Sequence, residues 1–141
     1  MRNFRNWDVW KNGKILVKEI YLLTANYPDS EKYSLSNQLR RASVSIPANI
    51  AEGAGRSTDK DFRSFLYNAL GSAFELETLV DLSFDLEFIS KEQYDLVYDK
   101  INHIQRQLNS LINKIKVWLM YYSYQIENST AKYNFRSRIN E

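Results

Sequence analysis

The chain has 141 residues, of which 44% are hydrophobic and 26% charged, and this suits a single globular domain. It contains no cysteine, which excludes disulfides and cysteine-based metal sites or nucleophiles. No apolar run approaches the roughly 18 residues of a membrane span, and the N-terminus has no signal-peptide core, so we expect a cytoplasmic protein.

The net charge of +2 is divided unevenly along the chain. Residues 1–56 hold nine Lys/Arg and five Asp/Glu, residues 57–99 hold three and ten, and residues 100–141 hold seven and two. Such segregation is typical of a nucleic-acid partner, but equally of helices that pair through opposite charge within a bundle or between subunits. The charge pattern leaves both interpretations open.

The first two predicted helices meet at a proline-containing turn. The first runs from about Trp7 to Asn26, because Pro28 disfavours helix in the residue before it. The second begins near Ser34 or Ser36, both good N-caps, and ends between Gly53 and Gly55. Its apolar residues recur four and three apart, which indicates one buried helical face. These residues are Leu35, Leu39, Ala42, Ile46 and Ile50.

Pro47 lies inside the second helix. A proline there removes one backbone hydrogen bond and crowds the carbonyl group of Ser43, at a cost of about 3 kcal/mol. We therefore expect the helix to kink or end at this point, with the side chains of Ser43 and Asn49 placed to satisfy freed carbonyl groups.

The third helix is predicted to open at Ser57–Asp59, where acidic residues favour a helix N-terminus. Gly71 lies among small residues in its middle, so we expect another helix to approach closely there. The fourth helix opens with Ser90–Gln93, which fits a capping box. It continues with apolar residues alternately three and four apart, typical of a left-handed coiled-coil seam. These residues are Tyr94, Val97, Ile101, Ile104, Leu108, Leu111, Ile115, Trp118 and Tyr122.

Short connections between long helices make sequence neighbours antiparallel. The predicted fold is therefore an all-α, up-down-up-down four-helix bundle over residues 1–122, followed by a polar tail, residues 123–141, that is partly disordered or helical. In this tail cations alternate with aromatic rings, a pattern that suits single-stranded RNA but also an ordinary disordered terminus. The residues concerned are Lys132, Tyr133, Phe135, Arg136 and Arg138.

Two helices carry more apolar residues than one bundle core needs. On a helical wheel a second cluster lies away from the core stripe, and this favours a subunit interface over coverage by loops or the N-terminal arm. Its members are Val44, Ala48 and Ala51 on the second helix, and Leu79, Leu82 and Leu86 on the third.

Polar residues also share one side of the second helix. Arg41, Ser45, Asn49, Glu52 and Arg56 fall within a sector of about 80°. One interpretation is a binding surface for phosphate or a partner, because arginine forks suit phosphate oxygens. We select as its contacts Arg40, Arg41, Asn49 and Arg56, with Lys114 and Lys116 as secondary contacts. The other interpretation is a structural network that includes Ser43, Ser45 and Glu52, with the arginines paired to Glu75, Glu77 or Asp81 of the acidic third helix.

The sequence contains no recognisable catalytic constellation. His103 is the only histidine and lies between seam positions, where it borders the core or faces solvent. A lone histidine without cysteine makes zinc improbable, and no Glu-x-x-His motif supports a di-iron site. Phosphate-binding glycine loops are absent from the sequence as well. We therefore expect no enzyme activity, cofactor, metal or small-molecule substrate.

The stretch Gln38–Gly53 resembles the signature of the four-helix-bundle family encoded by 23S rRNA intervening sequences, sometimes labelled as an S23 ribosomal protein. The segments Tyr21–Pro28 and Gly71–Thr78 are similar to that family too, and the likeness covers about residues 4–120. The resemblance implies a ring-like homopentamer and kinship with the accessory variability determinant of diversity-generating retroelements, a basic barrel that engages a reverse transcriptase and nucleic acid.

Together these observations lead to two hypotheses. The first is a non-enzymatic, homo-oligomeric bundle that binds RNA or an RNA–protein complex. The alternative is a structural adaptor that binds a partner protein without nucleic acid. A steep loss of affinity with salt would distinguish the first from the second.

Overall fold

Four α helices follow one another along the chain and are joined by short loops. The computed structural model describes the backbone of residues 2–139 and the side chains of residues 2–129. Its helices are α1 (Asp8–Thr24), α2 (Leu35–Ala54), α3 (Asp59–Asp85) and α4 (Lys91–Ile139). The one-turn 3-10 helices η1 (Phe4–Asn6) and η2 (Asp29–Glu31) precede α1 and α2. Residues 2–139 contain no strand, so the all-α prediction is confirmed.

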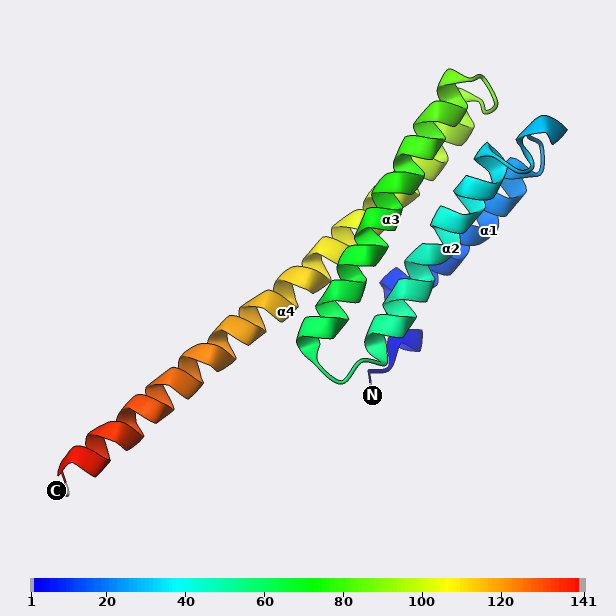
Figure 1. The fold of residues 1–141 in the computed structure, drawn as a ribbon. Helices are drawn as coiled ribbons and strands as arrows, with labels where there is room; N and C mark the ends of the chain where they lie inside the picture. The colour runs from blue at the N-terminus through cyan, green and yellow to red at the C-terminus, as the bar shows by residue number, and fades with distance from the viewer. Residues whose placement is uncertain (1, 140–141) are drawn as a thin grey trace.

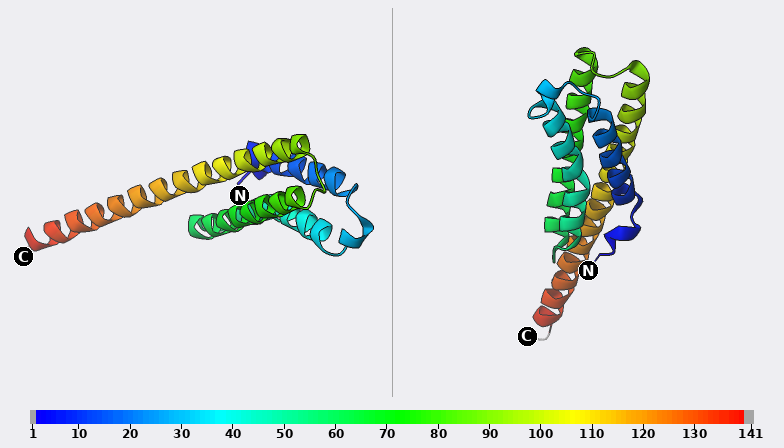
Figure 2. Two further views of the ribbon diagram at one scale, coloured as in Figure 1. Left: turned by 90° about the horizontal axis from the view of Figure 1, so that it is seen from above. Right: turned by 90° about the vertical axis from the view of Figure 1, so that its right-hand side faces the viewer.

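The helices form the predicted up-down-up-down bundle. Each helix packs against the next along the chain, and α1 also packs against α4, whereas the backbones of the described parts of the diagonal pairs α1/α3 and α2/α4 stay farther apart. Figure 1 shows the antiparallel course of successive helices, and Figure 2 shows that α1 and α4 form one layer and α2 and α3 the other. Short loops thus produce the antiparallel neighbours expected from loop length.

The helix starts follow local capping chemistry. The Thr58 hydroxyl accepts a hydrogen bond from the Asp61 amide at 3.1 Å and caps α3. At α4 the Ser90 hydroxyl accepts from the Gln93 amide at 3.2 Å, while the Gln93 side chain accepts from the Ser90 amide at 2.9 Å, which confirms the capping box. At α2 the N-cap residue Ser34 makes no side-chain cap. The Glu31 carboxylate instead accepts from the Leu35 amide at 3.3 Å and from the Ser34 hydroxyl at 2.5 Å.

The core is one continuous cluster with contributions from all four helices. Its fully buried large side chains include Leu16, Ile20, Leu39, Ile46, Ile50, Leu66, Leu76, Val80, Ile101, Ile104, Leu108 and Ile112. Leu79 also belongs to it and is only 7% exposed, so the expectation that Leu79 faces away from the core is wrong. Because α3 has neighbours on two sides, its buried arc is wider than one narrow stripe.

Pro47 does not end α2, and its ring packs against another helix. The helix continues on both sides of the proline, whose ring is buried against α1 at Gly13. A Cβ atom built on Gly13 would lie 3.4 Å from the Cβ atom of Pro47, an ordinary contact distance. Ser43 donates to the Arg40 carbonyl and Asn49 to the Ser45 carbonyl, both at 2.8 Å, so the two side chains do bond to helix carbonyls near Pro47 but to other carbonyls than that of Ser43.

The glycines of α2 and α3 have different surroundings. A Cβ atom on Gly53 would lie 2.7 Å from the Cβ atom of Phe65 and 3.1 Å from Cδ2 of Phe62, so α3 crosses α2 closely at this point. A Cβ atom on Gly71 would meet nothing within 4 Å. Among the described residues no helix therefore approaches Gly71 itself, although Ser72 beside it meets Ser45 of α2, and the tight glycine crossing lies at Gly53.

Helix α4 continues well past the other three helices, as Figure 1 shows. The apolar seam is buried through Leu108 and Ile112 and partly buried at Leu111 and Ile115. Beyond this point Trp118 is 51% and Tyr122 53% exposed. The seam was expected to be covered as far as Tyr122, but the starts of α1 and α3 lie level with an earlier turn of α4, so no other helix of the chain reaches the later turns.

Candidate nucleic-acid interface

The polar row of α2 is largely engaged within the protein. Arg41 forms an ion pair with Glu75 of α3 at 2.5 Å, and Arg56 pairs with Glu52 one turn earlier at 2.9 Å. The Arg56 guanidinium also lies 4.5 Å from the centre of the Phe65 ring. Both arginines stay about half exposed, so these are surface pairs that tie the side chains loosely.

Arg40, Ser45 and Asn49 are engaged as well, with partners on α1, α2 and α3. The Arg40 Nε atom donates to the Thr24 hydroxyl at 2.9 Å, and its guanidinium lies 4.8 Å from the centre of the Tyr21 ring. The hydroxyl groups of Ser45 and Ser72 are 2.8 Å apart, and the Asn49 amide donates to the Ser45 hydroxyl at 2.9 Å. The geometry therefore matches the structural-network interpretation of this row more closely than an open phosphate site.

Other predicted acidic partners bind α4 rather than α2. Glu77 accepts a hydrogen bond from Gln105 at 2.5 Å. Asp81 accepts one from the Tyr94 hydroxyl at 2.6 Å, and this bond, with added desolvation and the charge of Asp81, raises the pKa of Tyr94 to about 12. Glu77 and Asp81 of α3 thus bind polar side chains of α4.

The two lysines predicted as secondary contacts, Lys114 and Lys116, face different helices. The Lys116 ammonium lies 5.5 Å from the centre of the Tyr67 ring on α3. Lys114 lines a groove between the start of α1 and the middle of α4. The cationic side chains Lys132, Arg136 and Arg138 lie outside the described side chains.

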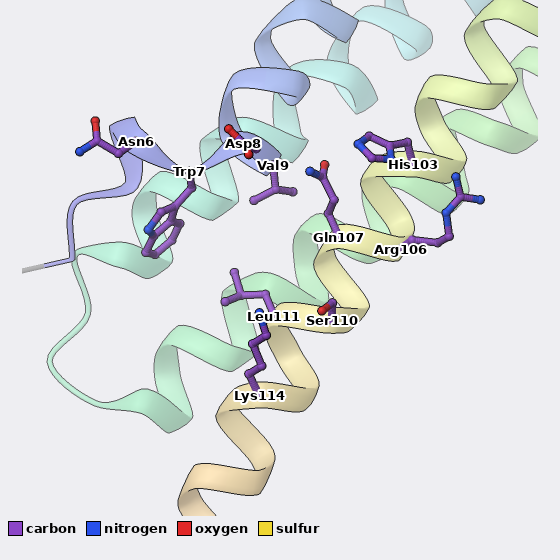
Figure 3. A pocket seen from close by; sticks show the side chains of 10 residues that line it. All are labelled: Asn6, Trp7, Asp8, Val9, His103, Arg106, Gln107, Ser110, Leu111 and Lys114. Atoms are coloured by element: carbon purple, nitrogen blue, oxygen red, sulfur yellow. The ribbon is translucent and has the colours of Figure 1, made fainter.

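The α1/α4 groove is lined by polar side chains and by two cations, Arg106 and Lys114. Its volume is about 580 Å³, and Figure 3 shows its ten lining side chains. From the N-terminal segment and α1 come Asn6, Trp7, Asp8 and Val9, and from α4 come His103, Arg106, Gln107, Ser110, Leu111 and Lys114. Trp7 packs on Phe62 with ring centres 5.5 Å apart, which anchors the wall of the groove.

The electrostatics of the groove favour an anion. Arg106 and Lys114 are exposed and form no ion pair among the described side chains, while Asp8 is the one carboxylate in the lining. The first turn of α1 also begins at this groove, and its N-cap residue Trp7 makes no side-chain cap. A helix N-terminus and two free cations together attract phosphate oxygens.

Sequence reasoning missed most of this groove. It selected Lys114 and noted that His103 would border the core or face solvent, and His103 is in fact exposed. Arg106 and Ser110 were not considered. Their signal was the spacing of positions 103, 106, 110 and 114, which is as regular as the apolar seam and lies on another side of the same helix.

The predicted interface residues are mostly available at the surface. Val44 is 42%, Leu82 44% and Leu86 55% exposed, while Ala48 is exposed and Ala51 partly buried. Of the six predicted interface residues, only Leu79 is buried in the core. An apolar second face therefore exists on α2 and at the end of α3.

Metal and membrane sites are not evident in the described part of the chain. Among these residues no group of three or more histidine or acidic side chains is placed to hold a metal ion. None of the helices there combines the length and the hydropathy that crossing a bilayer requires.

Comparisons with known proteins identify the family. The family model described as "23S rRNA-intervening sequence protein" matches residues 5–110. A crystal structure of a protein of unknown function from the S23 ribosomal protein family of Bacteroides thetaiotaomicron VPI-5482 is similar, with 29% sequence identity and a TM-score of 0.67, over 74% of this chain and 97% of that chain. No curated protein matches significantly. The chain therefore belongs to the 23S rRNA-intervening sequence protein family.

Proposed function

We propose that this protein is a non-enzymatic, homo-oligomeric helix bundle of the cytoplasm that binds RNA, alone or within an RNA–protein complex. The main support for this proposal is the α1/α4 groove. Its cations Arg106 and Lys114 have no carboxylate partner among the described side chains, whereas Arg41 and Arg56 of α2 are paired. Free cations beside a helix N-terminus are what a phosphate backbone requires.

The experiment is a binding titration of the full-length protein with a labelled rRNA fragment at several salt concentrations. We expect affinity to fall steeply with salt, because each phosphate contact releases condensed counterions. The double variant Arg106→Ala/Lys114→Ala should weaken binding by about tenfold or more and flatten the salt slope by about two contacts. Lys32→Ala, which removes one exposed charge in the connection between α1 and α2, is the control away from the groove.

The groove assignment fails if the double variant binds RNA like the wild-type protein while Lys32→Ala does too. The RNA function itself fails if no fragment binds at low salt. In that event the alternative function becomes the better one: a structural adaptor that binds a partner protein. The observation in its favour is the apolar surface of α2, the end of α3 and the projecting turns of α4.

Self-association is part of the proposal. The exposed apolar residues Val44, Leu82 and Leu86 support it, because exposed apolar side chains on a bundle suit a subunit interface. A ring of five copies is the arrangement that the family resemblance implies.

A further inference from the structure

We infer that the outer side of α4 binds RNA as a single strand, with phosphates in the α1/α4 groove and bases on the aromatic side chains just beyond it. This inference rests on the proposed RNA-binding function and adds the form of RNA that the site selects. It starts from a second hollow of about 610 Å³, lined by Ser110, Asn113, Lys114, Val117, Trp118 and Tyr121.

The two hollows adjoin each other. Ser110 and Lys114 line both, so the cationic groove lies next to the aromatic one on α4. We call the combined surface the α4 outer stripe. Its lining residues on α4 include His103, Arg106, Ser110, Lys114, Val117 and Tyr121. Successive members are three or four residues apart, and this spacing keeps them on one side of a helix.

The stripe changes character along its length. Its first half carries the cations Arg106 and Lys114, and its second half carries apolar side chains with Val117 67%, Trp118 51% and Tyr121 61% exposed. At 1.5 Å per residue the distance from His103 to Tyr121 is on the order of 27 Å. The stripe therefore offers phosphate contacts and ring surfaces within the span of one short oligonucleotide.

This combination selects unpaired bases. A cationic track with aromatic rings beside it is the usual means of holding single-stranded RNA, because every unstacked base presents a face to a ring. In a duplex the bases stack on each other and leave only phosphates and groove edges for the protein. A duplex would thus use the cationic half of the stripe and gain nothing from Trp118 and Tyr121.

A protein helix is a poorer occupant of the same stripe. An apolar helix seated along it would remove Arg106 and Lys114 from water without providing partners, which is costly. An anionic chain neutralises both. Asp99, one turn before His103, carries the opposite charge and marks the end of the cationic half.

The aromatic half lies outside the part of the chain that the family model matches. That match covers residues 5–110. Val117, Trp118 and Tyr121 follow it on α4. The preference for single strands is accordingly a property of the C-terminal turns of α4.

The test compares full-length wild-type protein with the double variant Trp118→Ala/Tyr121→Ala. The ligands are a labelled oligouridine of about ten nucleotides and an RNA duplex of the same length, measured by fluorescence anisotropy at one salt concentration. We expect the wild-type protein to prefer the single strand. The double variant should lose about tenfold or more in single-strand affinity and keep its duplex affinity.

Two further variants keep the test interpretable. Trp118→Phe retains a ring and should restore most of the lost affinity when compared with Trp118→Ala. Tyr33→Ala removes a tyrosine that is 85% exposed outside the stripe and should bind like the wild-type protein. Helix content by circular dichroism and mass by light scattering should be unchanged in all variants, because the altered side chains are exposed.

The possible outcomes distinguish the single-strand inference from the proposed RNA-binding function. If single strand and duplex bind alike and the double variant retains wild-type affinity, the single-strand inference is overturned while RNA binding stands. If the double variant instead changes the oligomeric mass, the aromatic half is a contact between copies, and the inference is again wrong. If neither RNA binds at low salt, the proposed function fails together with it.

Discussion

Gly53 of α2 lies so close to Phe65 of α3 that a Cβ atom at position 53 would be 2.7 Å from the Cβ atom of Phe65. This distance is shorter than any relaxed carbon–carbon contact, and the carbonyl oxygen of Phe62 would lie 3.3 Å away on the same side. The close crossing of α2 and α3 therefore depends on the missing side chain.

Gly53→Ala should destabilise the bundle by about 1–3 kcal/mol, because α3 has to move away. Gly71→Ala is the matched control, since its Cβ atom would meet nothing within 4 Å. That variant should stabilise the protein by about 0.5–1 kcal/mol through helix propensity. Chemical denaturation followed by circular dichroism, at one protein concentration, measures both. Equal effects of the two substitutions would contradict the assigned crossing.

Arg41→Ala should leave the fold intact and change the free energy of unfolding by less than about 1 kcal/mol. The ion pair with Glu75 is exposed, with the two side chains 61% and 41% accessible, and exposed pairs contribute little. The same variant should bind RNA within about twofold of the wild-type protein if the groove at Arg106 is the phosphate site. A large loss of RNA binding without unfolding would restore Arg41 as a contact residue.

The hydrogen bond from Tyr94 to Asp81 predicts a stability change at high pH. The pKa of Tyr94 is raised from 10.0 to about 12, so the folded protein holds this proton more tightly than the unfolded chain does. The stabilisation is therefore fully present below pH 10 and is lost as the pH rises toward 12. The stability difference between wild-type and Tyr94→Phe proteins should decline across this window.

The absorbance of the phenolate form measures the ionisation of Tyr94 directly. Asp81→Asn keeps a hydrogen-bond acceptor but removes the charge, so Tyr94 should then ionise closer to pH 10. A titration curve that is identical in wild-type and Asp81→Asn proteins would show that the bond does not hold the proton in solution.

Val44→Asp should reduce the mass of the assembly. Val44 is 42% exposed on the outer side of α2, and a charge placed there would be buried in any interface that uses this face. Tyr33→Asp, on a residue that is 85% exposed in the α1–α2 connection, is the control. Multi-angle light scattering at micromolar concentration measures both. A wild-type mass near 16.7 kDa, that of one copy, would refute self-association altogether.

The elements of this fold could be predicted from sequence because local chemistry defines them. Thr58 and Ser90 cap α3 and α4 through contacts within one turn, and the core residues recur with helical period. The pairing of Arg41 with α3 also followed from charge, since the residues nearest on that helix are acidic.

Other features depend on where the helices stop, and a single sequence does not encode that locally. Trp118 continues the seam pattern of Ile104 and Leu108, yet it is half exposed because the remaining helices end before it. Leu79 shows the reverse effect, since two neighbouring helices bury it despite its position off the stripe. Arg106 was overlooked because its role depends on Trp7 and Asp8, which are distant in sequence and form the opposite wall.

Because one unbroken helix carries both halves of the α4 outer stripe, their alignment is a matter of helical phase. One residue inserted between Lys114 and Val117 would rotate Tyr121 about 100° away from Arg106, although every side chain would be retained. Seven inserted residues would return it to within about 20°. Related chains that use the same surface should therefore differ in length here by numbers of residues that nearly restore the phase, about seven, eleven or eighteen, and a chain with a one- or two-residue change should have lost the alignment.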